Sequence, residues 1–277
     1  MFHRLIRPSF FPVLLILIIT AVIISYYAVK IEPYTVTINN VNLSNNFPEN
    51  LKIIQISDIQ ISENYQASDF QKIISQINQL SPDIFIFTGD LYENYSSYGP
   101  EEELIQLLAG ISAAYGKYAV WGNRDYGGGA VRRFEKIMTA GGFQVLCNEG
   151  VHIMLNNGDR LFLAGLDDSL MGTPDITPIL SQMKEDDSYR ILMLHEPDAA
   201  DLYADYGFEL MLAGHSHGGQ VNLPFLSSPT TSVAEKYQKG LYDIESSEKI
   251  KLYVNSGIGT SHFPIRFRVP PEITVFD

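Results

Sequence analysis

The side chains with the clearest chemical potential stand directly after apolar runs that predict buried strands. The runs KIIQIS, DIFIFTG, KYAVWG, RILML and FELMLAG are followed, in this order, by Asp58, Asp90, Asn123, His195 and the His-x-His pair His215 and His217. Ligand sites of open α/β sheets form at the carboxyl ends of their strands. We therefore expect five strand ends to bring carboxylates, an amide and imidazoles to one common rim.

This set of side chains suits a pair of divalent metal ions. A carboxylate shared by two cations lowers their mutual repulsion, and the pair can bind a phosphate and activate a water molecule for in-line attack. Imidazole and carboxylate ligands suit Mn, Fe or Zn. The single cysteine, Cys147, excludes a disulfide within the chain and a zinc site built from thiolates. We expect Cys147, in the strand-like segment FQVLCNEG, to be a buried thiol.

Each of these residues also has a simpler interpretation. Asp58 and Asp90 precede predicted helices and would suit N-caps. His215 and His217 would suit a polar turn, and His195 would suit a hydrogen-bonded position in the core. Their joint occurrence at five strand ends favours the metal site over these alternatives.

The elements that must position these residues alternate between short apolar strands and helical periods. Helices are predicted for residues 69–80, 101–115, 129–142, 176–186 and 199–203. Strands are predicted for residues 51–57, 83–90, 117–123, 142–148, 151–157, 160–168, 190–198, 208–217, 251–257 and 272–277. Repeated strand–helix units predict an α/β fold, and the Asn157-Gly158 hairpin turn predicts that strand directions are mixed.

Composition limits the kinds of partner. Hydrophobic residues make up 45% and charged residues 18% of the 277-residue chain, as in folded globular proteins. The net charge of −13 argues against a nucleic-acid partner, because binding a polyanion needs clustered Lys and Arg. Bound metal ions would reverse the local field, so an acidic protein can still bind a phosphate ester.

The N-terminal segment predicts a membrane anchor. Residues 10–29 carry no charge, and about 20 apolar residues are needed to span a bilayer. Arg4 and Arg7 precede this run, so the positive-inside rule places residues 1–9 in the cytoplasm and the rest of the chain outside. A cleavable signal peptide is the alternative, but Tyr26 and Tyr27 stand where small residues would be needed. We expect a stalk or first strand at residues 30–50 and the catalytic domain at residues 51–277.

Five short segments together resemble the signature motifs of calcineurin-like metallophosphoesterases. In chain order they are SDIQ at Asp58, GD at Asp90, GNRD at Asn123, His195, and GHSH at His215 and His217. The endings GHSHGGQVNLPF and LYVNSGIGTSHFPIRFRVPPEI are similar to the membrane-associated branch of YkuE-like phosphoesterases and UDP-2,3-diacylglucosamine hydrolases. The resemblance covers about residues 51–277. It implies two mixed β-sheets packed as a sandwich and flanked by helices, behind one N-terminal transmembrane helix.

The resemblance also implies roles for single residues. Asp90 would bridge two metal ions. Asp58 and His217 would complete the first metal site, and Asn123, His195 and His215 would complete the second. His195 would also take part in catalysis, and Asn123 would contact the substrate.

Two positions depart from the family pattern. Gln60 stands where the first motif normally has a histidine, and its amide oxygen would bind a metal more weakly, which favours Mn or Mg at the first site. The alternative is that Gln60 is a loop residue that contacts no metal. Arg124 stands where most of the family has a histidine that assists the leaving group. Its guanidinium suits phosphate oxygens, which favours a diester or pyrophosphate whose leaving group needs little protonation. We expect the adjacent Asp125 to support catalysis without binding metal.

Three further positions are predicted to be structural. His152 lies within a predicted strand and His262 in a C-terminal loop, although His262 has the alternative of reaching the site. Asp167 and Asp168 are expected to form a turn, with lining of the substrate groove as the alternative.

We interpret the chain as a phosphoric ester hydrolase with two divalent metal ions, Mn being favoured. Its substrate would be a membrane-associated phosphodiester or pyrophosphate, such as a UDP-diacylglucosamine-like lipid or a phospholipid. A phosphomonoesterase is the second choice, and a degenerate fold that binds phosphate without turnover is an interpretation of another class. The sequence leaves the substrate, the native metals and the oligomeric state open.

Overall fold

Two mixed β-sheets form the centre of the molecule. The computed structural model describes residues 10–43, 47–184, 186–225, 228–246 and 250–277, so the predicted cytoplasmic tail with Arg4 and Arg7 lies outside the described residues. Sheet 1 has the strand order β1 (Thr37–Val41), β12 (Glu272–Phe276), β2 (Ile53–Ile56), β3 (Ile84–Phe87), β4 (Lys117–Ala119) and β5 (Phe143–Val145). Sheet 2 has the order β10 (Gly240–Ile244), β11 (Ile250–Val254), β9 (Leu210–Ala213), β8 (Tyr189–Met193), β7 (Arg160–Gly165) and β6 (Glu149–Met154).

Four neighbouring strands of each sheet run parallel. In sheet 1, β2, β3, β4 and β5 are parallel to one another, and β12 is antiparallel to β2. In sheet 2, β7, β8, β9 and β11 are parallel, while β6 and β10 form antiparallel edges. Parallel strands end at the same edge of their sheet. The loops that follow β2, β3 and β4 therefore leave one edge of sheet 1, where they meet the loops that follow β8 and β9 of sheet 2.

Three apolar layers hold the sheets and helices together. The core between the sheets joins, for example, Ile84 and Ile86 of sheet 1 to Ile191 and Leu212 of sheet 2. A second core lies between sheet 1 and the helices α2 (Ala67–Leu80), α3 (Glu101–Ala109) and α5 (Phe134–Ala140). A third lies between sheet 2 and the helices α6 (Thr177–Gln182) and η2 (Pro197–Tyr203), the latter a 3-10 helix. This confirms the predicted α/β sandwich flanked by helices.

Local sequence explains the elements nearest the site. The strands IIQI and IFIF are buried at every position, because parallel strands in the middle of a layered fold are covered on both faces. In α2, Phe70, Ile73 and Ile77 recur at helical spacing and are buried against sheet 1. The side chain of Asp69 accepts a hydrogen bond from the backbone N–H of Gln66 at 3.1 Å, which caps the start of this helix.

Several local predictions differ from the structure. The helix predicted for residues 101–115 ends at Ala109, where Gly110 follows, and β10 and the single-turn helix α4 (Asn123–Tyr126) were not predicted. Cys147 is exposed, so the prediction of a buried thiol is wrong. The physical reason is that β5 ends at Val145, which leaves Cys147 in the turn toward β6. The short 3-10 helices η1 (Glu32–Tyr34) and η3 (His217–Gly219) complete the fold.

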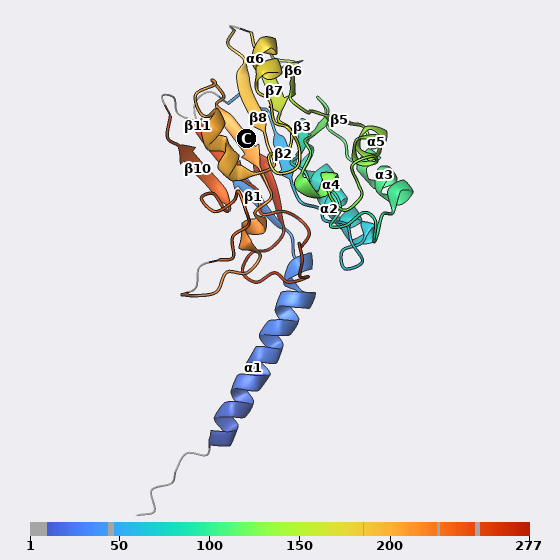
Figure 1. The fold of residues 1–277 in the computed structure, drawn as a ribbon, viewed down its shortest axis with the longest axis vertical. Helices are drawn as coiled ribbons and strands as arrows, with labels where there is room; N and C mark the ends of the chain where they lie inside the picture. Colours follow the sequence, from blue (N-terminus) through green and yellow to red (C-terminus); the bar gives the residue numbers. More distant parts are fainter. Residues whose placement is uncertain (1–9, 44–46, 185, 226–227, 247–249) are drawn as a thin grey trace, which may run out of the picture.

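One long apolar helix projects from the layered domain. Helix α1 (Phe10–Lys30) extends away from both sheets in Figure 1, and its side chains from Phe11 to Tyr27 are exposed. Its length and composition are sufficient to cross a membrane. After η1 the chain enters β1, which pairs in parallel with β12 and is therefore the edge strand of sheet 1.

If α1 anchors the protein, the full-length chain should sediment with membranes and resist extraction by carbonate or high salt. A chain that begins after Lys30 should be released into the soluble fraction and serves as the control. Protease added outside intact cells should cleave the domain, because the predicted orientation places it outside. Recovery of the full-length chain in the soluble cytoplasmic fraction would contradict both the anchor and its orientation.

Candidate metal centre

The predicted ligands gather in the loops that leave the carboxyl ends of β2, β3, β4, β8 and β9. The backbones of several of these residues adopt the left-handed conformation, with φ values of 48° at Asp58, 51° at Gln60, 65° at Asp90, 66° at His215 and 50° at His217. This region is unfavourable for residues other than glycine, and such strain clusters at functional sites. Their positive φ values also show that Asp58 and Asp90 are not helix N-caps, so that simpler interpretation is wrong.

Glycines let the loops come this close. A Cβ atom on Gly89 would lie 2.7 Å from Nδ1 of His195, and one on Gly214 would lie 2.6 Å from Oδ2 of Asp58. Neither distance leaves room for a methyl group. The glycines beside Asp90 and His215 are therefore a steric requirement of the rim.

Hydrogen bonds fix which ring nitrogen of two histidines faces the site. Nδ1 of His195 donates to the carbonyl oxygen of Thr88 at 2.6 Å, and Nε2 of His215 donates to that of Ser232 at 2.8 Å. A carbonyl only accepts, so the neutral forms present the lone pairs of His195 Nε2 and His215 Nδ1 to the centre. Backbone carbonyls commonly orient metal-binding histidines in this way.

These lone pairs point at one another. Nδ1 of His215 lies 3.3 Å from Nε2 of His195 and 3.1 Å from Oδ1 of Asn123. Electron-pair donors at these distances repel unless a proton or a metal ion lies between them. The arrangement fits a divalent cation bound by His195, His215 and Asn123.

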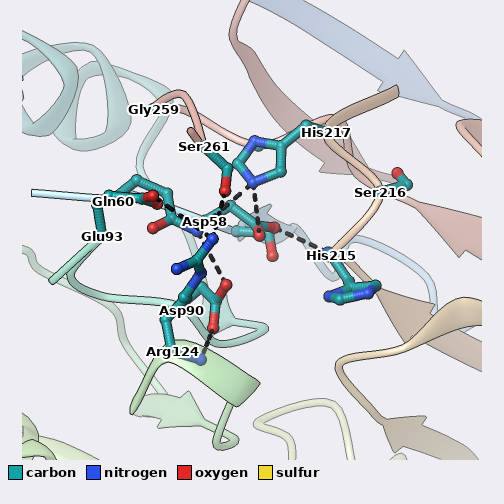
Figure 2. A network of polar contacts seen from close by, with 12 residues as sticks. Asp58, Gln60, Asp90, Glu93, Arg124, His215, Ser216, His217, Gly259 and Ser261 are labelled. Atoms are coloured by element: carbon teal, nitrogen blue, oxygen red, sulfur yellow. Dashed lines mark hydrogen bonds and ion pairs between the residues drawn. The ribbon is translucent and has the colours of Figure 1, made fainter. Parts of the chain in front are cut away.

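Asp90 lies between two halves of the rim. Its Oδ1 accepts a hydrogen bond from the backbone N–H of Arg124 at 2.8 Å and lies 3.5 Å from Nε2 of His195. Its Oδ2 accepts from the amide nitrogen of Gln60 at 2.8 Å. Figure 2 shows this carboxylate between the side chain of Gln60 and the backbone of Arg124. Each oxygen of Asp90 therefore faces a different group of predicted ligands.

The other half of the rim contains Asp58, Gln60 and His217. Oδ1 of Asp58 lies 3.3 Å from Nε2 of His217, and that nitrogen lies 3.4 Å from the amide nitrogen of Gln60. Oδ1 of Asp58, Oε1 of Gln60 and Nδ1 of His217 are buried without a hydrogen-bond partner. An unsatisfied buried carboxylate oxygen is uncommon, and Oδ1 of Asp58 beside Nε2 of His217 fits a bound cation.

The electrostatics favour positive charge at the centre. Burial tends to raise the pKa of Asp90, but His195 and His215 and the Arg124 backbone amide lower it to about 2. Burial tends to lower the pKa of His195, yet Asp90 beside it raises that pKa well above its usual value. Burial lowers the pKa of His217 to about 4, which keeps this ring neutral near neutral pH. The centre thus holds an ionised carboxylate and has a site where positive charge is stabilised.

Arg124 lies at the mouth of the centre. Its Nη2 donates to Oγ of Ser261 at 3.0 Å, lies 3.1 Å from Nε2 of His262 and pairs with Glu93 at 3.4 Å. A cavity of about 360 Å³ opens here, and its walls include Asp90, Asn123, Arg124, Leu170, His215, His217, Thr231, Ser232, Ser261 and His262. His262 therefore reaches the site, which was the alternative to its structural interpretation.

Asp125 faces away from this cavity. Its Oδ2 accepts from the backbone N–H groups of Asp90 at 2.8 Å and Gly122 at 2.9 Å, and its Oδ1 accepts from that of Leu91 at 2.9 Å. The carboxylate thus ties the Asp90 loop to the start of α4. These bonds suit a positioning residue.

A buried acid pair beside His195 was missed by the sequence reasoning. Glu196 and Asp168 are both fully buried. Burial and the hydrogen bond with Glu196 raise the pKa of Asp168 to about 8. Glu196 also lies within reach of a cation near His195 and His215. The sequence signal for this pair was the carboxylate of Glu196 directly after His195, but its partner Asp168 comes from the distant loop after β7.

His152 lies outside the centre, where its Nε2 is 2.9 Å from the carbonyl oxygen of Gln182.

The chain is similar to known phosphoesterases. Residues 51–219 match the calcineurin-like phosphoesterase family. The metallophosphoesterase YkuE of Bacillus subtilis is 38% identical over 90% of this chain and 88% of its own length. A metallophosphoesterase of Campylobacter jejuni is 30% identical over 94% of this chain and 68% of its own length. A zebrafish transmembrane protein with a metallophosphoesterase domain is 28% identical over 96% of this chain, which spans 62% of that protein.

If Asp125 holds the Asp90 loop, Asp125→Asn should lower the free energy of unfolding by about 1–3 kcal/mol, the usual cost of leaving a buried hydrogen-bonding group without a partner. The amide NH₂ would replace an acceptor with a donor opposite backbone N–H groups. Urea unfolding followed by circular dichroism on the detergent-solubilised chain measures this. Asp187→Asn is the matched control, because the Asp187 side chain is 90% exposed, and we expect a change below about 0.5 kcal/mol. Equal effects of the two substitutions would contradict the positioning role.

Proposed function

Because the chain belongs to the calcineurin-like phosphoesterase family, we propose that this metal-dependent hydrolase cleaves a phosphodiester or pyrophosphate bond in a membrane-associated, amphipathic substrate. The observation that carries the proposal is the position of Asp90, whose two carboxylate oxygens face two separate groups of ligands. A phosphate ester bound at this point would lie against both groups at once.

Each group has the composition of a metal site. We propose that Asp58, Gln60 and His217 hold one divalent ion with Asp90. Asn123, His195 and His215 would hold the second, also with Asp90. Such a pair, when bound, neutralises phosphate charge and supplies an activated water molecule for in-line displacement. The remaining steps depend on groups of the protein itself.

The ligand types support manganese as a native metal. The donors are carboxylate, amide and imidazole, and no thiolate is among them. Gln60 offers an amide oxygen, which can bind a hard cation such as Mn²⁺. This bond is weaker than the bond that an imidazole would make with a softer cation. In the structure its amide nitrogen donates to Asp90, so binding a metal would require the amide to turn and present Oε1, which now has no partner.

Arg124 is suited to stabilise charge on the substrate. Its guanidinium reaches the cavity mouth and is held there by Glu93 and Ser261. Arginine stays protonated at ordinary pH, so it cannot serve as the acid that protonates a leaving group. Its N–H groups can instead donate to phosphate oxygens as negative charge develops. This favours diesters and pyrophosphates with good leaving groups over ordinary monoesters.

A membrane-associated substrate is supported by the apolar helix α1, which joins the domain directly. Single-pass anchoring would keep the cavity close to lipid at all times. We propose that the domain lies outside the cytoplasm and acts on a phospholipid or a nucleotide-linked lipid. The catalytic groups would then meet substrates that diffuse in the membrane plane.

If Asp90 is shared by two ions, Asp90→Ala should lose both ions and reduce turnover of a chromogenic phosphodiester to background, because both sites lose a charged ligand. His217→Ala should weaken mainly one ion and Asn123→Ala mainly the other. Metal analysis after equilibrium dialysis against Mn²⁺ measures this, with Asp159→Ala in the exposed hairpin turn as the control. Wild-type metal content and turnover in Asp90→Ala would show that the ligand assignment is wrong.

If Arg124 stabilises transition-state charge, Arg124→Ala should lower turnover by about 10²- to 10³-fold, the scale for losing one such donor. The loss should be independent of pH near neutrality, because arginine does not titrate there. Arg124→His should regain activity preferentially on monoesters, with a new pH dependence near the ordinary histidine pKa of about 6.5.

The pH–rate profiles of the wild type, Arg124→Ala and Arg124→His provide the measurement. Arg160→Ala controls for loss of an arginine from the surface, because the Arg160 side chain is 49% exposed and pairs only weakly with Asp186 at 3.4 Å. If Arg124→Ala turned over every tested phosphodiester at the wild-type rate, Arg124 would have no part in the mechanism. A phosphate-binding module would then be favoured.

A further inference from the structure

Two neighbouring loops beside the candidate site carry strongly exposed apolar side chains. Leu223 and Phe225, on the loop after η3, are 41% and 104% exposed, and Phe263, on the loop after β11, is 71% exposed. Scattered apolar residues on a surface are ordinary, but aromatic rings exposed to this extent on adjoining loops indicate an interaction surface. We call Leu223, Phe225 and Phe263 the apolar lip.

The two loops behave as one structural unit. The backbone N–H of Asn222 donates to the carbonyl oxygen of Phe267, and that of Phe267 donates to Gln220, each at 2.9 Å. The side chain of Gln220 also bonds both the N–H and the carbonyl oxygen of Ser261, at 2.7 and 3.0 Å. The bases of the two loops that bear the apolar lip are therefore held at a fixed position relative to one another.

This unit is joined to the end of α1. The backbone N–H of Arg266 donates to the carbonyl oxygen of Ala28 at 3.0 Å, and the rings of Tyr27 and Phe267 meet edge to face at 6.5 Å. The carboxylate of Glu32 accepts from the backbone N–H of Val269 at 2.7 Å. Tyrosines at the end of an apolar span mark the depth of the membrane–water interface. The part of this loop that follows Phe263 thus lies beside the end of the apolar span.

A buried arginine makes this junction rigid. The guanidinium of Arg266 is fully buried and donates to the backbone carbonyl oxygens of Ser256, Gly257, Gly259 and Val269. The loop cannot move away from the domain without breaking these bonds. In Figure 1, the orange and red loops of this unit lie at the end of the domain from which α1 projects.

The same loops carry part of the candidate site. His217 precedes the loop with Leu223 and Phe225, and Ser261 and His262 precede Phe263 and line the cavity. Figure 2 shows Ser261 and His217 close to Arg124. A surface bound by the apolar lip would therefore lie next to the cavity mouth.

We propose that the apolar lip inserts into the interfacial region of the lipid bilayer and holds the mouth of the cavity against the membrane. The proposal rests on the proposed anchoring by α1. The bilayer is the occupant because the apolar lip is continuous, through Phe267 and Tyr27, with the helix that would enter it. Lys30 and Arg268 are exposed at the same junction, and basic side chains favour the headgroup level.

Site-specific fluorescence in nanodiscs tests this placement. Cys147 is exposed, so Cys147→Ser provides a background free of thiols, and an environment-sensitive dye is attached at Phe225→Cys or Phe263→Cys in the full-length chain. The nanodiscs contain phosphatidylcholine and phosphatidylglycerol, with or without lipids spin-labelled near the headgroup. Ile18→Cys on α1 reports on the anchor. Met154→Cys is the matched control, because Met154 is equally apolar and 61% exposed on β6.

Interfacial segments lie about 5–10 Å into the headgroup and acyl boundary, so spin labels there should lower the fluorescence at positions 225 and 263 roughly twofold. The dye at position 154 should be unaffected. A second set of nanodiscs contains lipids spin-labelled deep in the acyl chain. If these lipids quenched the dye at position 18 while no lipid quenched the dyes at 225 and 263, insertion of the apolar lip would be ruled out and the anchor would stand. No quenching at any position would overturn both. Self-quenching between dyes on separate chains in detergent, without lipid quenching, would assign the surface to a second copy and overturn the proposal.

Discussion

The carboxylate of Asp90 is the interaction on which the rest of the site depends. It is buried, ionised and positioned so that its two oxygens face different ligand groups. A buried charge of this kind is stable only if it is paired and hydrogen-bonded. The Arg124 backbone amide and Gln60 supply hydrogen bonds, and Nε2 of His195 and Nδ1 of His215 face each other at 3.3 Å, which favours positive charge between them. The electrostatics of the rim therefore favour a bound cation.

The close approach of the loops that form the rim strains their backbone. The loops that deliver Asp58, Asp90, His215 and His217 all contain residues with positive φ, and Gly89 and Gly214 let them approach one another closely. Asp125 offsets part of this cost by bonding three backbone N–H groups of the Asp90 and α4 loops. The two six-stranded sheets provide a rigid base, since the strands that lead into these loops are completely buried. Strain can persist at the rim because the sandwich below it leaves no room for relaxation.

Much of this organisation could be predicted from the sequence, and the exceptions have physical causes. Continuous apolar runs identified the buried strands, and the polar residues that end them identified the rim, because parallel strands leave a sheet at one edge. The signal was weaker where a feature depends on contacts between distant segments. The Asp168–Glu196 pair and the bonds of Arg124 to Ser261 and His262 join loops that are far apart in the chain. Cys147 was misplaced because its strand ends two residues before it, and periodicity does not locate strand ends sharply.

The central claim is that Asp90 holds two metal ions close enough to share one phosphate group. Electron paramagnetic resonance of the Mn²⁺-loaded full-length chain in detergent tests it directly, because two manganese ions bridged by a carboxylate are exchange-coupled. We predict a coupled spectrum that appears as the second equivalent of Mn²⁺ binds and that is absent in Asp90→Ala. The hyperfine pattern of isolated Mn²⁺ ions in the fully loaded wild type would contradict the account.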